Sequence, residues 1–196
     1  MLMRVIAGIA KGVVLRSPKG ACVRPATDRV KESLFGALGD RVEGARVLDL
    51  FAGSGSVGIE ALSRGAVHCT FFDNNAMCLR AIRENLAKTR LEKRATVVRG
   101  NALKIKKILV VAEGDIDLAF VDPPYALTRQ MDVGSPVGQL LLGMCEGAFL
   151  RDRALVVVEH STSSSVPDHL AKLDLYDRRR YGDTTISIFE RQSTAV

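Results

Sequence analysis

Short apolar segments alternate with amphipathic segments through most of this chain of 196 residues. The apolar segments end at turns and are rich in Val, Leu, Ile and Phe, which is typical of strands buried inside a parallel sheet. We expect strands over Arg46 to Phe51, Val67 to Phe72, Ala95 to Arg99, Ile116 to Val121 and Ala154 to Glu159. The alternation predicts an α/β fold in which helices cover both faces of a mostly parallel sheet.

Helical patterns fill the intervals between these strands. Ala76 to Lys88 places apolar residues at helical spacing, and Asn74 or Asn75 can cap its first turn. Further helices are expected over Ile59 to Arg64, over Pro136 to Glu146, and from a Thr27 cap through Glu32 to Leu38. Each helix would link two neighbouring strands or open the sheet.

The two ends of the chain read as hairpins. Val5 to Leu15 is rich in β-forming residues and interrupted by glycines, while Leu173 to Tyr181 and Thr184 to Arg191 flank a Gly-Asp pair. We expect a basic β-hairpin extension over residues 1–25 and one catalytic domain over residues 26–196.

Positive charge is concentrated at the start of the chain. The formal net charge is +6, and residues 1–31 hold seven Lys or Arg against the single acid Asp28, so the charges of residues 32–196 balance. A basic segment of this kind favours an anionic partner. No apolar run approaches the roughly 20 residues that span a bilayer, and no leader pattern is visible, so we expect a cytoplasmic protein. Its four cysteines lack metal-site or redox spacing, which indicates reduced thiols.

A glycine-rich turn follows the first expected strand. The stretch from Asp49 to Gly58 has the Gly-x-Gly-x-x-Gly pattern between a strand and a helix, where nucleotide-like cofactors bind. Asp73, directly after the second strand, can accept hydrogen bonds from both hydroxyls of a ribose. Asp49 would repel a pyrophosphate and suits a cationic or amino-acid-like end of a ligand. By itself, the pattern is compatible with NAD, a flavin or S-adenosylmethionine as the cofactor.

A second motif, Asp122-Pro123-Pro124-Tyr125, follows the apolar strand Ile116 to Val121. The Asp122 carboxylate and the Pro123 carbonyl would present two acceptors to the two protons of an exocyclic amine on a nucleobase. These acceptors would stabilise the positive charge that develops on the amine nitrogen during methyl transfer. Tyr125 would stack on a base that has been flipped out.

Together, the two motifs resemble class I S-adenosylmethionine-dependent methyltransferases that modify exocyclic amines of nucleic acid bases. More closely, the chain resembles the RsmD family, bacterial enzymes that methylate the N2 amine of one guanine in 16S rRNA. The similarity includes Arg4-Val-Ile-Ala-Gly8, the stretch from Arg24 to Phe35, and Tyr181-Gly182-Asp183-Thr184. Ala26 and the segment Ala10-Lys11 with Val13 depart from the family pattern. The resemblance implies a Rossmann-like, mostly parallel seven-stranded sheet with an N-terminal β-hairpin.

Carried over to this sequence, the resemblance implies roles for individual residues. The catalytic residues would be Asp122, Pro123, Pro124 and Tyr125. S-adenosylmethionine would be held by Thr27, Asp28, Asp49, Phe51, Gly53, Gly55, Asp73, Asn74, Asn101 and Ala102. The RNA contacts would be Arg4, Lys11, Arg16, Lys19 and Arg24. The partner would be 16S rRNA, within a small subunit or an assembly intermediate, and the enzyme would be a monomer that needs no metal or membrane.

Three other functions fit parts of the sequence. The same chemistry could serve adenine N6 or cytosine N4, because the catalytic motif does not distinguish these amines. An NAD-dependent oxidoreductase fits the glycine-rich turn, but His68, His160 and His169 lie at a strand start, beside a serine loop and in an expected helix, so none suggests a proton-transfer site. A non-catalytic ribosome assembly factor would not need the Asp-Pro-Pro-Tyr motif.

Overall fold

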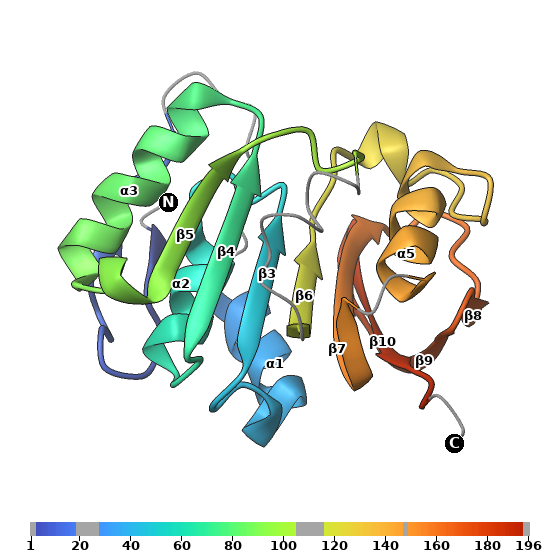
Figure 1. Cartoon of the computed structure of the whole chain (residues 1–196), viewed down its shortest axis with the longest axis horizontal. Coiled ribbons are helices and arrows are strands. Elements are labelled where there is room, and N and C mark those ends of the chain that lie inside the picture. Colours follow the sequence, from blue (N-terminus) through green and yellow to red (C-terminus); the bar gives the residue numbers. More distant parts are fainter. Residues whose placement is uncertain (1–2, 19–27, 105–115, 147–148, 194–196) are drawn as a thin grey trace. The chain divides into compact units, whose positions relative to one another are not determined.

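The computed structural model of this protein describes residues 3–18, 28–104, 116–146 and 149–193. Contacts between residues divide the chain into two compact units, Met1–Asn101 and Ala102–Val196. Each unit combines strands with helices (Figure 1).

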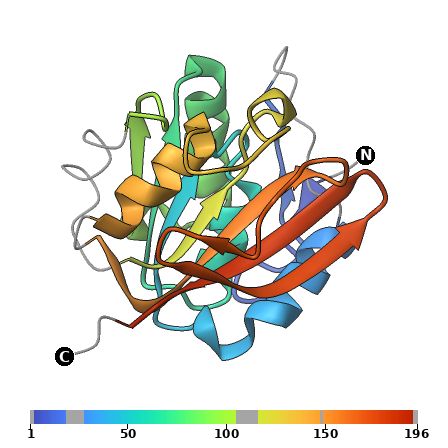
Figure 2. The same ribbon diagram turned by 90° about the vertical axis from the view of Figure 1, so that its right-hand side faces the viewer.

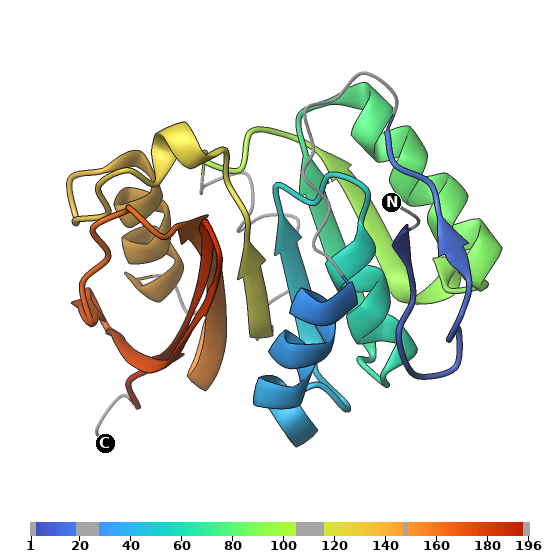
Figure 3. The same ribbon diagram turned by 180° about the vertical axis from the view of Figure 1, so that it is seen from behind.

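A parallel sheet of three strands forms the centre of the first unit. Its strands are β3 (Arg46–Leu50), β4 (His68–Asp73) and β5 (Ala95–Arg99), in the order β5-β4-β3. The other elements are α1 (Asp28–Leu38), η1 (Gly39–Arg41), α2 (Ser56–Ser63), α3 (Ala76–Thr89) and η2 (Glu92–Arg94). In Figure 3, α1 and α2 lie in front of the strands. β3 and β4 are buried almost throughout, and their centres contain the apolar residues Val47, Leu48, Phe71 and Phe72.

Helix α3 begins and ends where its sequence predicts. The Oδ1 of Asn75 accepts the N–H of Met77 at 2.8 Å, so Asn75 is the N-cap. Arg90 ends the helix in a left-handed conformation with φ 59°. The apolar side of the helix, including Leu79, Ile82 and Leu86, is buried. The helix therefore presents its polar side to solvent.

A small hairpin precedes α1. Strand β1 (Met3–Arg4) pairs antiparallel with β2 (Val14–Leu15), and we call residues 3–15 the N-terminal hairpin. Its predicted hairpin character is confirmed. Beyond their own pairing, the strands depend on contacts with α1, α2 and α3 to hold them in place, because two-residue strands are too short to be stable alone.

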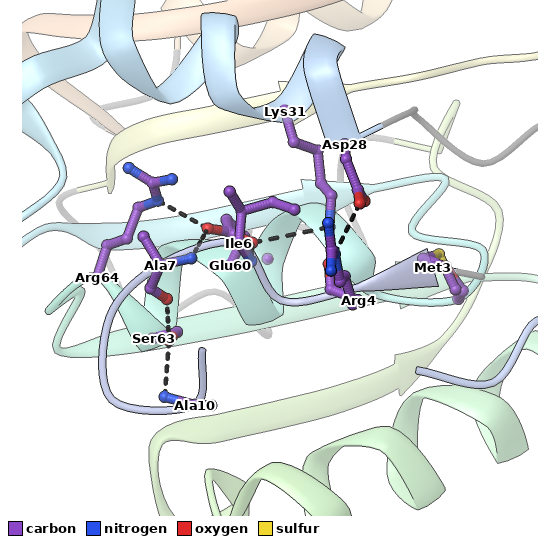
Figure 4. A network of polar contacts seen from close by, with 12 residues as sticks. Met3, Arg4, Ile6, Ala7, Ala10, Asp28, Lys31, Glu60, Ser63 and Arg64 are labelled. Carbon is purple, nitrogen blue, oxygen red and sulfur yellow. Dashed lines mark hydrogen bonds and ion pairs between the residues drawn. The ribbon is translucent and has the colours of Figure 1, made fainter. Parts of the chain in front are cut away.

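The fully buried carboxylate of Glu60, on α2, makes the most important of these contacts (Figure 4). It accepts the backbone N–H groups of Ile6 at 2.7 Å and Ala7 at 3.0 Å, and the Nε of Arg64 at 2.8 Å. The ammonium group of Lys31, also fully buried, lies 3.7 Å from Glu60 and donates to the carbonyl of Arg4. One carboxylate thus joins the hairpin to both α1 and α2.

The second unit contains the rest of the strands. They are β6 (Ile116–Val121), β7 (Leu150–Ser161), β8 (His169–Leu170), β9 (Leu173–Tyr181) and β10 (Thr184–Arg191), in the order β6-β7-β10-β9-β8. Only β6 and β7 pair in parallel; the other pairs are antiparallel, and β9 and β10 form the long hairpin drawn in red in Figure 2. The unit also contains η3 (Tyr125–Leu127) and α5 (Pro136–Glu146).

Five predicted elements, β5, β6, α5, β9 and β10, have the expected bounds, and β3, β4 and α3 differ by one residue at one or both ends. Helix α2 begins at Ser56 rather than Ile59, and two parts of the second unit also differ. Strand β7 starts at Leu150 rather than Ala154, because backbone pairing with β6 continues through an irregular stretch whose exposed polar residues show no strand pattern. The expected helix around His169 is wrong, because Leu170 is buried opposite Leu173 in the two-residue strand β8. Apart from the hairpin, the described residues of the two units form eight strands. Seven were expected, and β8 is the additional strand.

Three of the cysteines, Cys69, Cys78 and Cys145, are buried free thiols, as expected, and Cys22 lies outside the described residues. Within the described ranges, no helix is long and apolar enough to cross a membrane.

The buried contact between Glu60 and Lys31 yields a prediction about stability. Changing Glu60→Gln should lower the free energy of unfolding by about 3 to 5 kcal/mol, because it leaves the Lys31 ammonium buried without its counter-charge. Chemical denaturation followed by circular dichroism would measure the change. The same substitution at Glu84, which pairs with Arg80 on the surface, serves as the control and should have a much smaller effect. Equal destabilisation by both substitutions would contradict the importance of the Glu60 contact.

Candidate functional site

The glycine-rich turn connects β3 to α2 in a shape that only glycine permits at two positions. Gly55 is the N-cap of α2 with φ 75°, in the left-handed region. A Cβ on Gly58 would lie 2.4 Å from Cε1 of Phe71, so any side chain there would push into β4. The turn can therefore pass close to the sheet and leave its backbone available to a ligand.

Asp73 fastens this turn to the end of β4. Its Oδ2 accepts the N–H of Gly53 at 2.9 Å, and its Oδ1 accepts the N–H of Asn75 at 2.8 Å. A carboxylate has about four acceptor positions, so Asp73 can make these two bonds and still accept hydrogen bonds from a ligand. The side chain is nearly buried, with 9% of its surface exposed.

Asp49 supports the other side of the turn. Its carboxylate is buried and accepts the N–H of Gly58 at 3.1 Å. Burial raises the pKa of Asp49 to about 7, the hydrogen bond from Gly58 opposes this rise, and the charge of Asp73 adds to it. Near neutral pH the carboxyl therefore holds a proton part of the time, and a cation placed beside it would favour its release.

Phe51, between these groups, has φ 60°, a conformation that residues other than glycine rarely adopt. Strain of this kind is concentrated at functional sites, where the surrounding structure maintains it. Asn74 and Asn101 are exposed at the ends of β4 and β5. The first unit thus places Asp49, Phe51 and Asp73 at one turn, while Ala102, the first residue of the second unit, is buried.

Asn85 on α3 was not predicted from the sequence, yet it supports the same turn. Its buried Nδ2 donates to the carbonyl of Ser54 at 2.9 Å and to that of Arg16 at 2.9 Å, and its Oδ1 accepts the N–H of Arg16 at 2.7 Å. The hydroxyl of Ser54 also donates to Sδ of Met3 at 3.3 Å. The one available signal was an asparagine on the apolar side of a predicted helix, where a polar group needs partners.

The Asp-Pro-Pro-Tyr turn lies in the second unit, immediately after β6. Asp122 is exposed, Pro123 is buried and Tyr125 begins η3. The carbonyl of Pro124 closes the turn by accepting the N–H of Leu127 at 2.8 Å. The hydroxyl of Tyr125 lies 2.7 Å from Oγ1 of Thr184 on β10, which fixes the ring at both ends. Thr184 was predicted only as part of a closing strand.

The predicted RNA contacts lie partly in ion pairs. The guanidinium of Arg4 pairs with Asp28, itself a predicted cofactor contact, at 2.8 Å, and that of Arg16 pairs with Glu84 at 3.0 Å. Lys11 is exposed in the hairpin. Thr27, Lys19 and Arg24 lie outside the described residues.

The histidines have structural neighbours. His160 is buried between the carbonyl of Ser161 and the hydroxyl of Ser187, each at 2.9 Å, and burial lowers its pKa. His68 lies 3.0 Å from the hydroxyl of Thr96 on β5. Over the described part of the chain, no three His, Cys, Asp or Glu side chains gather as metal ligands would.

Comparisons with known proteins extend over almost the whole chain. Over 190 residues the chain is 36% identical to the putative rRNA methyltransferase YlbH of Bacillus subtilis, covering 97% of this chain and 100% of that protein. It is 31% identical over 191 residues to the ribosomal RNA small subunit methyltransferase D of Escherichia coli K12, covering 97% and 91%.

A solved structure shows the same fold. The putative methyltransferase yhhF from Escherichia coli superposes with a TM-score of 0.78 at 31% identity, over 99% of this chain and 100% of that one. The Rossmann-like fold of class I methyltransferases is therefore confirmed. A family model described as Conserved hypothetical protein 95 matches residues 3–190. The chain accordingly belongs to this family, which is the RsmD family that its sequence motifs resemble.

Proposed function

We propose that this protein is an S-adenosylmethionine-dependent methyltransferase that modifies the exocyclic N2 amine of a guanine in 16S rRNA. One observation carries the proposal: the buried carboxylates of Asp49 and Asp73 hold the glycine-rich turn by its backbone N–H groups. Carboxylates placed there favour a ligand with ribose hydroxyls and a cationic end over a pyrophosphate. The names of the relatives in B. subtilis and E. coli support methylation of rRNA, and the name of the E. coli relative supports the small subunit.

The residues of the turn fit this cofactor. Asp73 has acceptor positions left for the ribose hydroxyls, and Asp49 is suited to the cationic amino-acid end. The family resemblance implies that Thr27, which lies outside the described residues, and Asp28 would contact the methionine part. The backbone of Gly53 and Gly55 would follow the cofactor, and further contacts would come from Phe51, Asn74, Asn101 and Ala102. When bound, S-adenosylmethionine supplies an electrophilic methyl group on a sulfonium sulfur.

The Asp-Pro-Pro-Tyr turn would act on the base. The Asp122 carboxylate and the Pro123 carbonyl accept the two protons of the amine and orient its lone pair. The amine nitrogen would gain positive charge as its bond to the methyl carbon forms and the bond from that carbon to the sulfonium sulfur breaks, with the electron pair left on a neutral thioether sulfur. The two acceptors would stabilise this charge more strongly than the neutral amine. The Asp122 carboxylate would then take one of the two N–H protons, which leaves a neutral methylated amine. Tyr125, whose hydroxyl is held by Thr184, stacks on the base. A conjugated amine is a poor nucleophile, so positioning supplies most of the acceleration.

Residues 1–25 would form the RNA-contacting extension and residues 26–196 the methyltransferase domain. The substrate would be 16S rRNA within a small subunit or an assembly intermediate, and the enzyme would act in the cytoplasm as a monomer.

The proposal is tested by incubating the protein with labelled S-adenosylmethionine and hypomethylated small subunits, then mapping the modified nucleotide. Naked 16S rRNA serves as the second substrate. The expected result is one N2-methylguanine. Label at adenine N6 or cytosine N4 would change the substrate assignment, and an absence of transfer to both substrates would overturn the proposal.

The acceptor role of Asp122 leads to a prediction about turnover. Asp122→Ala should lower kcat by at least about 100-fold, because it removes one of two groups that stabilise the charged amine. The affinity for S-adenosylmethionine, measured by calorimetry, should change less than about twofold. A variant with unchanged kcat would remove Asp122 from the mechanism.

The raised pKa of Asp49 leads to a prediction about pH. Below about pH 7 the free protein holds a proton on Asp49, and a cationic ligand end expels it. The bound state then carries fewer protons than the free state, so affinity rises with pH up to about 7 and levels off above it. The slope should approach tenfold per pH unit.

Calorimetry in buffers of different ionisation enthalpy would show proton release at pH 6. Asp49→Asn should abolish both the release and the slope. An equal pH dependence in wild type and variant would contradict the placement of Asp49 beside a cation.

The contacts of Asn85 lead to a prediction about cofactor binding in the absence of RNA. Asn85→Ala should weaken S-adenosylmethionine binding about tenfold, because it leaves the carbonyl of Ser54 without its buried donor and loosens the turn. Glu84→Gln is the matched control, since it breaks the ion pair with Arg16 on the neighbouring position of α3 but leaves Ser54 untouched. If both variants bind the cofactor equally well, Asn85 has no positioning role.

A further inference from the structure

The charge balance of residues 32–196 conceals a second basic segment. Residues 76–94, which include α3 and η2, hold six Lys or Arg against the two acids Glu84 and Glu92. The rest of the chain compensates with an excess of acids, so the segment does not appear in the overall count. A local excess of positive charge of this size on one helix is typical of a surface that binds an anionic partner.

The structure places these charges on the solvent side of α3. Arg80, Arg83 and Lys88 are exposed on the helix, while its opposite side is buried. Arg90, at the C-cap, and Lys93, in η2, continue the exposed basic residues beyond the end of the helix. The exposed side of the helix is therefore mostly basic from Arg80 to its C-terminal end.

The N-terminal hairpin adjoins this side of α3 (Figure 3). The guanidinium of Arg16, just beyond β2, pairs with Glu84 at 3.0 Å, and Nζ of Lys88 lies 3.4 Å from the carbonyl of Val14. Glu84 also pairs with Arg80 at 3.0 Å, so two arginines surround this acid and neutralise it. Arg16, just beyond the hairpin, and the basic residues of α3 thus belong to one surface.

We propose that this surface, formed by Arg16, Arg80, Arg83, Lys88, Arg90 and Lys93, binds the phosphates of an RNA segment away from the target nucleotide. The inference rests on the proposed rRNA substrate and extends the RNA contact from the hairpin to α3. Phosphate contacts of this kind hold an RNA in register without reading its sequence.

The chemistry of the surface favours RNA over an acidic protein. Interfaces between proteins are centred on aromatic or aliphatic anchors. Near this surface the large exposed apolar side chains are Met77, 47% exposed and one turn before Arg80, and Val14, 44% exposed, whose carbonyl lies beside Lys88. Neither is aromatic, and six cations outnumber them, which suits a polyanion.

The test compares two double variants by their RNA binding as a function of salt. Arg83→Gln with Lys93→Gln removes two charges from the surface, and Arg41→Gln with Lys172→Gln removes two exposed charges elsewhere. Binding of wild type and of each double variant to 16S rRNA transcribed in vitro, and to hypomethylated subunits, is measured by filter retention between low and high KCl. Wild type is assayed in parallel for binding and for methyl transfer to hypomethylated subunits.

The surface variant should lower the slope of log K against log salt by about 1.4 to 1.8 and weaken binding about tenfold or more at moderate salt. Its affinity for S-adenosylmethionine and the slope of the control variant should not change. Equal salt slopes in wild type and surface variant would overturn the proposal. It would also be overturned if the surface variant lost affinity for subunits but not for naked RNA, because that result indicates a protein partner. If wild type transfers methyl groups but wild type and surface variant have equal salt slopes, only the assignment of the surface is wrong. If wild type neither binds RNA nor transfers methyl groups, the proposed function is wrong as well.

Discussion

The carboxylate of Glu60 is the contact on which the first unit depends most. It lies at the centre of α2, which begins directly after the glycine-rich turn, and it holds both the hairpin and Lys31 of α1. An uncompensated charge at this depth would be costly, so each of its partners must stay in place. The hairpin, predicted as an arm for RNA, is consequently part of the support for the turn. Asn85 adds a second connection between the hairpin and that turn.

Much of the fold could be predicted from local sequence, and the reason is visible in particular elements. The strands β5, β6, β9 and β10 have the predicted bounds because turn residues interrupt their apolar patterns at both ends. The first part of β7 could not be predicted, since its exposed residues Arg151, Asp152 and Arg153 interrupt the apolar pattern, and ion pairs with Asp117 and Glu190 on other strands are not visible in the sequence. His169 was misplaced because a strand of two residues is too short to show a period.

The residues of the candidate site could likewise be predicted only in part. The glycine-rich turn and the Asp-Pro-Pro-Tyr turn are continuous motifs, so their residues could be named in advance. Asn85 and Thr184 act on those motifs from distant parts of the chain, at separations of 31 and 59 residues from Ser54 and Tyr125. The one local signal for Asn85 was a polar residue on the apolar side of a helix, and no local pattern marks Thr184 as a partner of Tyr125. The net charge of residues 32–196 is zero because the basic segment over residues 76–94 is offset by an excess of acids in the other residues of that range. The sum alone therefore did not reveal the basic segment. The division between a basic arm and a neutral core is thus less sharp than the count implied.

The central claim is that the turn held by Asp49 and Asp73 binds S-adenosylmethionine and not a dinucleotide. Equilibrium binding of S-adenosylmethionine and of NAD to the purified protein, measured side by side by calorimetry, tests it most directly. The account predicts saturable binding of S-adenosylmethionine and no detectable binding of NAD at the same concentrations. Binding of NAD without binding of S-adenosylmethionine would contradict it.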